Sequence, residues 1–458
     1  MQSVIQDSQA TLRDLPSQIV ERGLKAGATD VVGQIEIEKR RMVRFSNNSI
    51  TVTMTWDVVS PSIYLGFGNR SIASRLGDTS ISTLEKTIAQ MLPAVKALPD
   101  TIESHIPKGP FSYKHISGLY DPKIPSLDEE LIDKVESAIN ASLKEGAKRV
   151  SGVLSSYHTQ KVLKTSAGAD ASTEQSLIEI SLRSFIEDDS SGQGISVATT
   201  LNEFDPAGAG QESGSMAKQS LHPKQGKEGK YNIVFGPSIF ANLINTTGFS
   251  ASAYGIEAGF SYFPDKLGKK VGSEQLTLTD DRLRPHAPGS VPFDDEGHPA
   301  QTNQLIDKGV LKTVNHDSRT AAKFKTRSTG NAVYASDIGQ IIPISTCLVL
   351  EPGEMSKDEI LEEAGDGLYI SNNWYTRFQN YRQGDFSTIP RDAMFQIQNG
   401  RLGPPVKGLR VSDNMIRILS CIRDVSKERK WIRWWEVDIP TYLGHFLVDQ
   451  VGITRSTG

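Results

Sequence analysis

Residues 231–281 carry the clearest fold signal in the chain, YNIVFGPSIFANLINTTGFSASAYGIEAGFSYFPDKLGKKVGSEQLTLTDD. We expect a strand over Tyr231–Phe235, then a helix that starts at the Gly236-Pro237 pair and runs through Asn245. Proline is well tolerated at the first helical position, because the N–H that it lacks would have no partner there. A glycine-rich turn follows, and the segment ends in a predicted strand closed by Asp280-Asp281.

Five downstream segments follow in an order that resembles one known family. They are Val291–Gly297, Leu305–Leu311, Arg327–Ala332, Gly384–Ser387 and Ile397–Gly408. Together with residues 231–281, they are similar to the motifs of the TldD/PmbA family of zinc proteases, over about residues 231–425. One such match would be weak, whereas several in the same order are a specific signal of resemblance.

The residues that would bind zinc in that family differ here. In the TldD branch the helix carries His-Glu-x-x-x-His, and the matching positions of this chain are Ile244, Asn245 and Phe249. That branch also uses a cysteine near the C-terminus, whereas residues 430–436 contain none. Alkyl and phenyl groups have no lone pair for a metal, and a neutral amide cannot act as a general base. The resemblance therefore implies the TldE (PmbA) branch, with no catalytic residue and no cofactor in this chain.

Composition limits the class of protein. The chain has 458 residues, 37% of them hydrophobic and 23% charged, at a net charge of −4. That length exceeds what one core usually holds, so two domains are expected. The near-neutral charge gives no overall attraction for nucleic acid or an anionic membrane. Two cysteines, and the lack of a signal-like or membrane-length apolar run, predict a cytoplasmic location.

A weak internal repeat organises the first half of the chain. Lys25–Ala28 and Lys144–Ala147 each end a helical pattern and open a β-rich stretch. The first helix is expected to present one apolar face made of Leu12, Leu15, Ile19 and Val20. A third helix is expected from Thr83 to about Leu98. The fold class is therefore predicted as α+β: an N-terminal antiparallel sheet with helices on one face, made of two repeated helix-plus-strand units, and a C-terminal, mostly antiparallel, barrel-like domain.

The composition shifts between residues 203 and 230, which are rich in glycine, proline and charge. We interpret this segment as a solvated connection, with a short helix in its alanine-containing middle. The predicted division is an N-terminal α+β domain over residues 1–202, a linker over 203–230, and a C-terminal TldD/PmbA-type domain over 231–458.

Acidic and histidine residues suggest weaker sites. Asp280-Asp281 and Asp294–Glu296 would suit calcium or paired acid–base carboxylates. Each lies at a strand end beside turn residues, so a solvated hairpin is the favoured interpretation. Among the eight histidines the nearest pair is His105 and His115, which leaves no local ligand pair for a metal.

Two aromatic runs are the best candidates for contacts. Residues 372–381 are compatible with intramolecular packing or with a partner or peptide surface, and residues 430–436 favour a strand that covers a core or a partner. We predict interface contacts from Trp374, Tyr375, Phe378, Trp434 and Trp435. A peptide-binding wall is predicted from Gly384, Asp385, Phe386 and Ser387, with pairing of strand edges as the binding mode.

The leading hypothesis is a metal-free TldE-like subunit of a heteromeric metalloprotease that acts on small or unfolded peptides. The resemblance implies that a TldD-like partner supplies the zinc and the catalytic glutamate, and we expect a homodimer when the chain is alone. Two alternatives stay open: a self-sufficient peptidase or hydrolase with an unrecognised site, and a non-catalytic peptide-binding modulator. A metal assay on the pure chain separates the first two hypotheses, and copurification from the native cell separates the first from the third.

Overall fold

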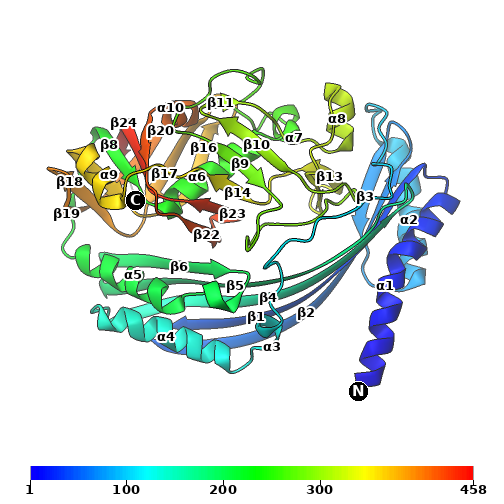
Figure 1. The fold of residues 1–458 in the computed structure, drawn as a ribbon, viewed down its shortest axis with the longest axis horizontal. Coiled ribbons are helices and arrows are strands. Elements are labelled where there is room, and N and C mark those ends of the chain that lie inside the picture. Colours follow the sequence, from blue (N-terminus) through cyan, green and yellow to red (C-terminus); the bar gives the residue numbers. More distant parts are fainter. Residues whose placement is uncertain (1, 457–458) are drawn as a thin grey trace.

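The computed structural model describes residues 2–456, with side chains described from Arg13 onward. The N-terminal half is a curled antiparallel sheet with helices, and the C-terminal half is a sheet-rich domain (Figure 1). The predicted α+β fold class is confirmed. On the first helix Leu15 and Ile19 are buried as expected, whereas the side chain of Leu12 lies outside the described residues.

The N-terminal elements form two copies of one pattern, a helix followed by three strands and a closing helix. They are α1 (Gln2–Lys25), β1 (Asp30–Ser46), β2 (Ser49–Gly66), β3 (Ser71–Arg75), α2 (Ile81–Ala97), α3 (Lys123–Ser126), α4 (Glu130–Lys144), β4 (Arg149–Thr165), β5 (Asp170–Glu187), β6 (Ser190–Ala198), η1 (Leu201–Glu203) and α5 (Pro206–Gln219). The strands form a six-stranded sheet in the order β3-β2-β1-β4-β5-β6, which is symmetric about the β1–β4 pair. The predicted repeat is confirmed, and α2 and α5 each close one unit.

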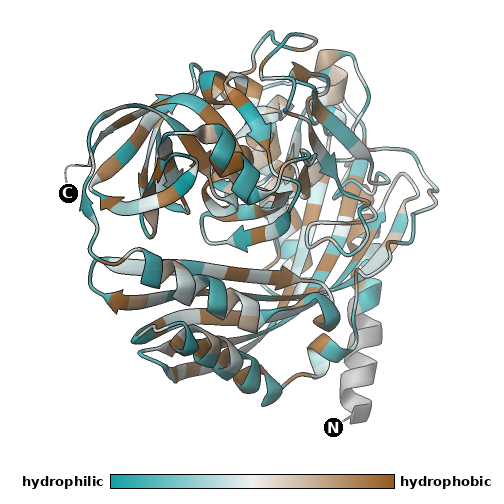
Figure 2. Ribbon diagram, turned by 60° about the vertical axis from the view of Figure 1, so that its left-hand side comes forward, coloured by the Kyte–Doolittle hydropathy of each residue, from teal (hydrophilic) through white to brown (hydrophobic). Residues whose placement is uncertain are grey.

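The helices cover one face of this sheet. On β1, Val31 and Ile35 pack in one apolar cluster with α1 and α2, and Val43 and Phe45 pack in a second cluster with α4. Side chains alternate across a strand, so the even-numbered residues of β1 point to the opposite face. Figure 2 shows the matching alternation of apolar and polar residues along the long strands. The second face of the sheet is the one turned towards the C-terminal domain (Figure 1).

Helix α5 occupies much of the segment that we interpreted as a solvated connection. Its buried side is made only of small residues: Ala209, Gly210, Ser213, Gly214 and Ala217. A Cβ atom on Gly210 would lie 2.1 Å from the carbonyl oxygen of Ala138 in α4, so only glycine permits this approach. The solvated interpretation is therefore wrong for residues 206–219, where the glycines serve close packing. The domain division itself stays a prediction.

The C-terminal half contains two large sheets. Its elements are β7 (Lys224–Gln225), β8 (Gly229–Phe235), α6 (Pro237–Ser250), α7 (Ala253–Glu257), β9 (Leu278–Asp281), β10 (Thr302–Asp307), β11 (Val310–Leu311), α8 (Ser318–Phe324), β12 (Ala332–Ala335), β13 (Gln340–Pro343), β14 (Leu348–Leu350), α9 (Lys357–Ala364), β15 (Gly367–Ile370), β16 (Asn373–Asn380), β17 (Asp385–Pro390), β18 (Met394–Gln398), β19 (Arg401–Lys407), β20 (Leu409–Asn414), α10 (Met415–Ser420), β21 (Ile422–Val425), β22 (Lys430–Trp434), β23 (Val437–Leu443) and β24 (Phe446–Arg455). A ten-stranded sheet runs β16-β17-β20-β24-β8-β15-β18-β19-β7, with β21 beside β24, and a six-stranded sheet runs β11-β10-β9-β14-β23-β22. Most neighbouring strands are antiparallel; the parallel pairs are β8–β15, β14–β23 and β7–β19.

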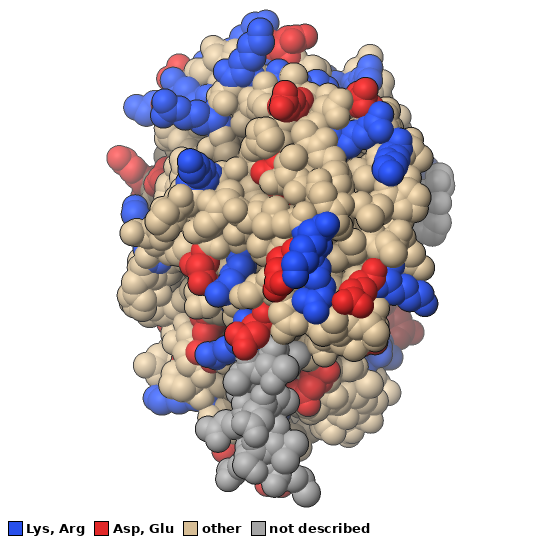
Figure 3. Space-filling model, turned by 90° about the vertical axis from the view of Figure 1, so that its right-hand side faces the viewer, with Lys and Arg blue, Asp and Glu red and all other residues tan. Residues whose placement is uncertain are grey.

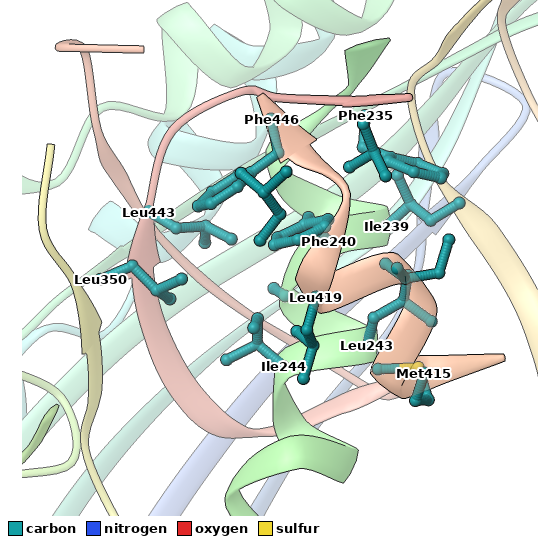
Figure 4. Packing of buried hydrophobic residues seen from close by; sticks show 14 of the residues in the cluster. Phe235, Ile239, Phe240, Leu243, Ile244, Leu350, Met415, Leu419, Leu443 and Phe446 are labelled. Carbon is teal, nitrogen blue, oxygen red and sulfur yellow. The ribbon is translucent and has the colours of Figure 1, made fainter. Parts of the chain in front are cut away.

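The main core surrounds helix α6. Phe240 stacks on Phe446 of β24 with ring centroids 3.9 Å apart, and Leu243 and Ile244 lie in the same cluster (Figure 4). This cluster also contains residues of both large sheets, so α6 is held on several sides. Tight packing of this kind fixes the position of each side chain along the helix.

The surface carries charges of both signs. On the face shown in Figure 3, basic and acidic side chains are interspersed, in agreement with the small net charge. Within residues 2–456, no helix combines the length and the apolar character needed to cross a membrane.

Candidate functional site

Helix α6 holds the positions that match the zinc motif of the TldD branch. Gly236 precedes the helix and Pro237 occupies its first turn, as predicted, but the helix continues past Asn245 to Ser250. Ile244 is fully buried in the main core, and Phe249 is half-buried near the end of the helix. Neither side chain has a lone pair to offer, so these positions do not fit a zinc ion.

Asn245 uses its amide to fasten α6 to strand β23. Its Nδ2 donates to the carbonyl oxygen of Ile439 at 3.0 Å, to Thr441 Oγ1 at 2.8 Å and to the carbonyl oxygen of Ala241 at 3.1 Å. Its Oδ1 accepts from the backbone N–H of Ile439 at 2.9 Å. The position needs a donor and an acceptor together, which an amide provides and an ionised carboxylate does not.

Asn242, one turn earlier, joins α6 to two other elements. Its Nδ2 donates to the carbonyl oxygen of Glu436 at 2.6 Å, and its Oδ1 accepts from Asn373 Nδ2 at 2.9 Å and from Thr376 Oγ1 at 2.6 Å. Glu436 in turn accepts from the backbone N–H of Tyr375 at 2.8 Å. This network positions β16 and the β22–β23 turn. Sequence reasoning missed it, because the only local signal was an amide three residues before Asn245 on the same helix and its partners are far away in the chain.

A cleft of about 630 Å³ lies between the N-terminal sheet and the C-terminal domain. Its N-terminal wall consists of side chains from β1, β4 and β5, including Arg40, Arg44, Tyr157, Glu179 and Arg183. Its C-terminal wall consists of Trp374, Arg433, Trp434, Trp435 and Asp438. The N-terminal residues were not singled out from the sequence. The alternation of charged and apolar residues along β1 was the available signal, since it predicts a second, polar face of the sheet.

The structure brings the two aromatic runs together at this cleft. The ring of Trp435 lies 5.5 Å from that of Trp374, 5.5 Å from that of Trp434 and 5.8 Å from that of Tyr375, measured between centroids. Trp435 is 55% exposed and Tyr375 is 47% exposed, so the cluster presents aromatic surface to solvent. Phe378 instead stacks on Tyr381 and packs against the main core.

Arginines connect the two walls. The guanidinium of Arg183 lies over the ring of Trp374 at 4.8 Å and pairs with Asp392 at 2.5 Å. Arg433 pairs with Glu179, which also accepts a hydrogen bond from the Tyr157 hydroxyl at 3.1 Å. Burial raises the pKa of that hydroxyl, so it stays protonated and donates.

Three donors in the cleft lining have no partner. The indole N–H groups of Trp374 and Trp434 and the Nε of Arg40 are buried and make no hydrogen bond within the described part of the chain. Arg40 also lies between the rings of Trp56 and Tyr157, at 5.2 Å and 5.0 Å. Buried donors are normally paired, so these groups suit a ligand rich in carbonyl or carboxylate oxygen.

Residues 384–387, which were predicted to form a peptide-binding wall, lie at the start of a strand inside the ten-stranded sheet and not at the cleft. The segment enters β17, which is paired with β16 on one side and β20 on the other, so it offers no free edge. Phe386 and Ser387 are buried, and Asp385 accepts from Asn414 Nδ2 at 2.8 Å. Gly384 adopts a positive φ of 83° where the chain enters the strand. None of the four residues lines the cleft.

The acidic hairpin is buried, so the solvated interpretation of Asp294–Glu296 is wrong. Asp294 accepts from the backbone N–H groups of Glu296, His298 and Ala332 at 2.8–3.1 Å. Burial raises the pKa of Asp294 to about 6, and burial together with Asp317 raises the pKa of Glu296. Asp280 is also buried and accepts from Asn331 Nδ2 at 2.6 Å. These carboxylates organise loops of the C-terminal domain.

Potential metal ligands are dispersed. Across the described residues, no three His, Cys, Asp or Glu side chains gather in an arrangement that could hold a metal ion. Cys421 follows α10 and is half-buried, with the Arg417 guanidinium 3.7 Å from its sulfur. The site that the structure does present is the cleft, whose chemistry is aromatic and cationic.

Most of the chain matches domains of one known protein family. Residues 121–221 match the PmbA/TldA metallopeptidase central domain, and residues 228–455 match the PmbA/TldA metallopeptidase C-terminal domain. A metalloprotease of Methanocaldococcus jannaschii is 29% identical over 47% of this chain and 48% of its own. A metalloprotease TldD homolog of Buchnera aphidicola subsp. Acyrthosiphon pisum is 28% identical over 48% of this chain and 45% of its own. The chain thus spans about half the length of these curated relatives.

A solved structure shares the whole fold. The crystal structure of TldE from Thermococcus kodakarensis superposes with a TM-score of 0.84, at 20% identity, over 96% of this chain and 100% of that one. The two matching domains, in the same order as the sequence motifs, establish that the chain belongs to the PmbA/TldD metallopeptidase family.

Proposed function

We propose that this chain is a metal-free, TldE-like subunit of a heteromeric metalloprotease that acts on small or unfolded peptides. A TldD-like subunit would supply the zinc and the catalytic glutamate, and this chain would supply the peptide-binding cleft. The observation that carries the proposal is helix α6, where Ile244 is part of the core and Asn245 is a structural amide. Both positions have a packing role that a zinc ligand or a general base would disrupt.

The cleft supports a peptide as the ligand. Its aromatic side chains offer flat apolar surface, and its buried donors suit the carbonyl oxygens of a peptide backbone. Strand β16, which carries Trp374, is the outer strand of the ten-stranded sheet, and within residues 2–456 no other strand pairs with its outer side, although the Tyr375 N–H already donates to Glu436. An extended peptide bound by backbone hydrogen bonds would be recognised with little dependence on its sequence, as unfolded substrates require.

The test compares the chain alone with the chain plus a TldD-like subunit from the same cell. Zinc content is measured by elemental analysis, and cleavage is measured with an unstructured peptide. We expect no stoichiometric zinc and no cleavage from the chain alone, and chelator-sensitive cleavage with the partner. The matched control is a TldD-like subunit whose motif glutamate is changed to glutamine, which should abolish cleavage. Stoichiometric zinc in the pure chain, or chelator-sensitive cleavage without the partner, would overturn the proposal.

A further inference from the structure

A second, smaller cavity lies where the N-terminal sheet meets loops of the C-terminal domain. Its volume is about 240 Å³, and it shares no lining residue with the cleft. The two halves touch near it, since the N–H of Ala73 in β3 donates to the carbonyl oxygen of Gly339 in the β12–β13 turn at 2.9 Å (Figure 1). Side chains of both halves form the cavity, so its chemistry depends on what each half contributes.

Three strands of the N-terminal sheet supply one wall. Gln34 and Glu36 of β1 are two residues apart, so their side chains lie on the same face of the sheet. Their partners on β2 are Ser62 and Ser60. On the other side of β1, Lys161 of β4 lies opposite Glu36. This wall therefore offers amide, carboxylate, hydroxyl and ammonium groups to a molecule in the cavity.

The wall from the C-terminal domain contains a buried arginine with an unused donor. Arg282 follows β9 and is 2% exposed. Its Nε donates to Thr346 Oγ1 at 3.2 Å, whereas its Nη1 makes no hydrogen bond within residues 2–456. A guanidinium is rarely buried without a full set of partners, because taking its charge out of water is costly. Arg282 therefore has hydrogen-bonding capacity left for a ligand of the cavity.

Two buried carboxylates that share this environment bond to other groups. Asp280 accepts from Asn331 Nδ2 at 2.6 Å and from the Cys347 N–H at 3.0 Å. Asp294 accepts from three backbone N–H groups. Burial raises the pKa of both carboxyl groups, and the positive charge of Arg282 opposes that rise. The charges thus act on one another through space, but neither carboxylate accepts a hydrogen bond from Arg282.

The other charged groups of the cavity are only partly matched. Lys161 pairs with Asp295. Arg75 is exposed, so it keeps contact with solvent. Glu36 is half-buried and forms no ion pair with any residue in the described part of the chain. The lining therefore combines a buried cation, Arg282, with a carboxylate that also lacks an ionic partner.

We propose that this cavity binds a free α-amino acid in its zwitterionic form. The carboxylate of the ligand would accept from Arg282, and its ammonium would donate to Glu36 and to a serine hydroxyl of β2. An apolar side chain would lie against Val291, Phe293 and Val333, which also line the cavity. A phosphate would bring negative charge beside Glu36, and a simple amine would bring positive charge beside Arg282. A zwitterion matches both groups at once.

Binding would strengthen the contact between the two halves of the chain. Glu36 belongs to the N-terminal sheet and Arg282 to the C-terminal domain, so one ligand would join them. A ligand that binds only the folded chain raises the free energy of unfolding. The inference does not rest on the proposed subunit role, because it concerns the isolated chain and needs neither zinc nor a peptide in the cleft.

The experiment measures ligand binding to the isolated full chain by isothermal titration calorimetry. The probes are L-leucine, L-leucinamide, which lacks the carboxylate, 4-methylpentanoate, which lacks the ammonium, and inorganic phosphate. We expect L-leucine to bind and to raise the thermal midpoint. Each other probe should bind at least about tenfold more weakly, because it leaves a group of the site unpaired. No binding of L-leucine would overturn the proposal. Equally tight binding of phosphate or 4-methylpentanoate would indicate a site for an oxyanion only and would also overturn it.

Variants of the two charged residues test where the ligand lies. Glu36→Gln should weaken L-leucine binding by about tenfold without weakening the binding of 4-methylpentanoate, since only the ammonium loses its partner. Arg282→Gln should abolish binding of L-leucine. The matched control, Glu38→Gln, changes the next residue on the same face of β1, which lies outside the cavity, and should leave binding unchanged.

The Glu36→Gln result stands by itself if Arg282→Gln does not fold, because Glu36 is only half-buried and glutamine keeps the shape of its side chain. An L-leucine affinity that is unchanged in Glu36→Gln, or that falls equally in Glu36→Gln and Glu38→Gln, would overturn the proposed site.

Discussion

Asn245 shows how a position that matches a catalytic residue can serve structure instead. Its amide donates to carbonyl oxygens of α6 and β23 and accepts from the Ile439 N–H. The neighbouring Ile244 is fully buried in the core. From the sequence, only the absence of zinc-binding atoms at these positions could be predicted. Their contacts depend on β23, nearly two hundred residues away in the chain, which no local pattern reveals.

The structural role of this amide can be tested directly. Asn245→Asp keeps the shape of the side chain but removes the donor, so the carbonyl oxygens of Ile439 and Ala241 would face a carboxylate. We expect the free energy of unfolding to fall by about 1–3 kcal/mol, measured by urea denaturation. Asn202→Asp, at an exposed position, is the control and should change it by less than about 0.5 kcal/mol. Equal stability of the two variants would contradict the structural role.

The aromatic elements β16 and β22 are distant in sequence but form one cluster at the cleft. Trp374 also stacks on Arg183 of the N-terminal sheet, so its removal would disturb the contact between the two halves. Tyr375 and Trp435 are more exposed, so their replacement tests the aromatic surface without removing the Trp374–Arg183 contact. The sequence predicted both runs as contact residues, and the structure brings them together; whether a partner or a peptide covers them stays a prediction.

We expect Tyr375→Ala with Trp435→Ala to weaken peptide binding or partner-dependent cleavage while the chain stays folded. Exposed aromatics at interfaces commonly contribute about 2 kcal/mol, which is roughly thirtyfold in affinity. Peptide affinity and cleavage by the reconstituted complex are measured, together with the thermal midpoint of the isolated chain. Phe260→Ala with Phe324→Ala removes comparably exposed aromatics elsewhere and is the matched control. If binding and cleavage are unchanged in the Tyr375/Trp435 variant, these two rings do not belong to a functional surface.

Composition alone predicted two buried elements, α5 and the Asp294–Glu296 hairpin, as solvated segments. The glycines of α5 resemble a linker, yet they allow contact with α4 at distances that exclude a Cβ atom. The Asp294–Glu296 hairpin resembles a solvated turn, yet three backbone N–H groups converge on Asp294. The contacts of Gly210 with Ala138 and of Asp294 with the Ala332 N–H join residues far apart in sequence, so composition alone did not reveal them. By contrast, the repeat around Lys25–Ala28 and Lys144–Ala147 was predictable because each copy is local.

The whole molecule combines a duplicated α-β-β-β-α sheet with a C-terminal domain built around α6. The repeat places β1 and β4 at the centre of the sheet, and their inner residues line the cleft. Duplication therefore supplies one wall of the site, and the aromatic elements of the C-terminal domain supply the other. The site depends on how the two halves meet, and for that reason sequence motifs of either half alone could not reveal it.

The connection between the halves should be the first point of proteolytic attack. Helix α5 is packed on the sheet, and β7 is held by β19, so within residues 203–230 the exposed Lys227 between β7 and β8 is the best target. We expect brief trypsin treatment to cut first near Lys227 and to leave a folded C-terminal fragment, identified by mass spectrometry. Changing Lys224, Lys227 and Lys230 together to glutamine should remove this cut and leave later cuts unchanged. First cuts within residues 60–200, or within α5, would contradict two separately folded halves joined at this point.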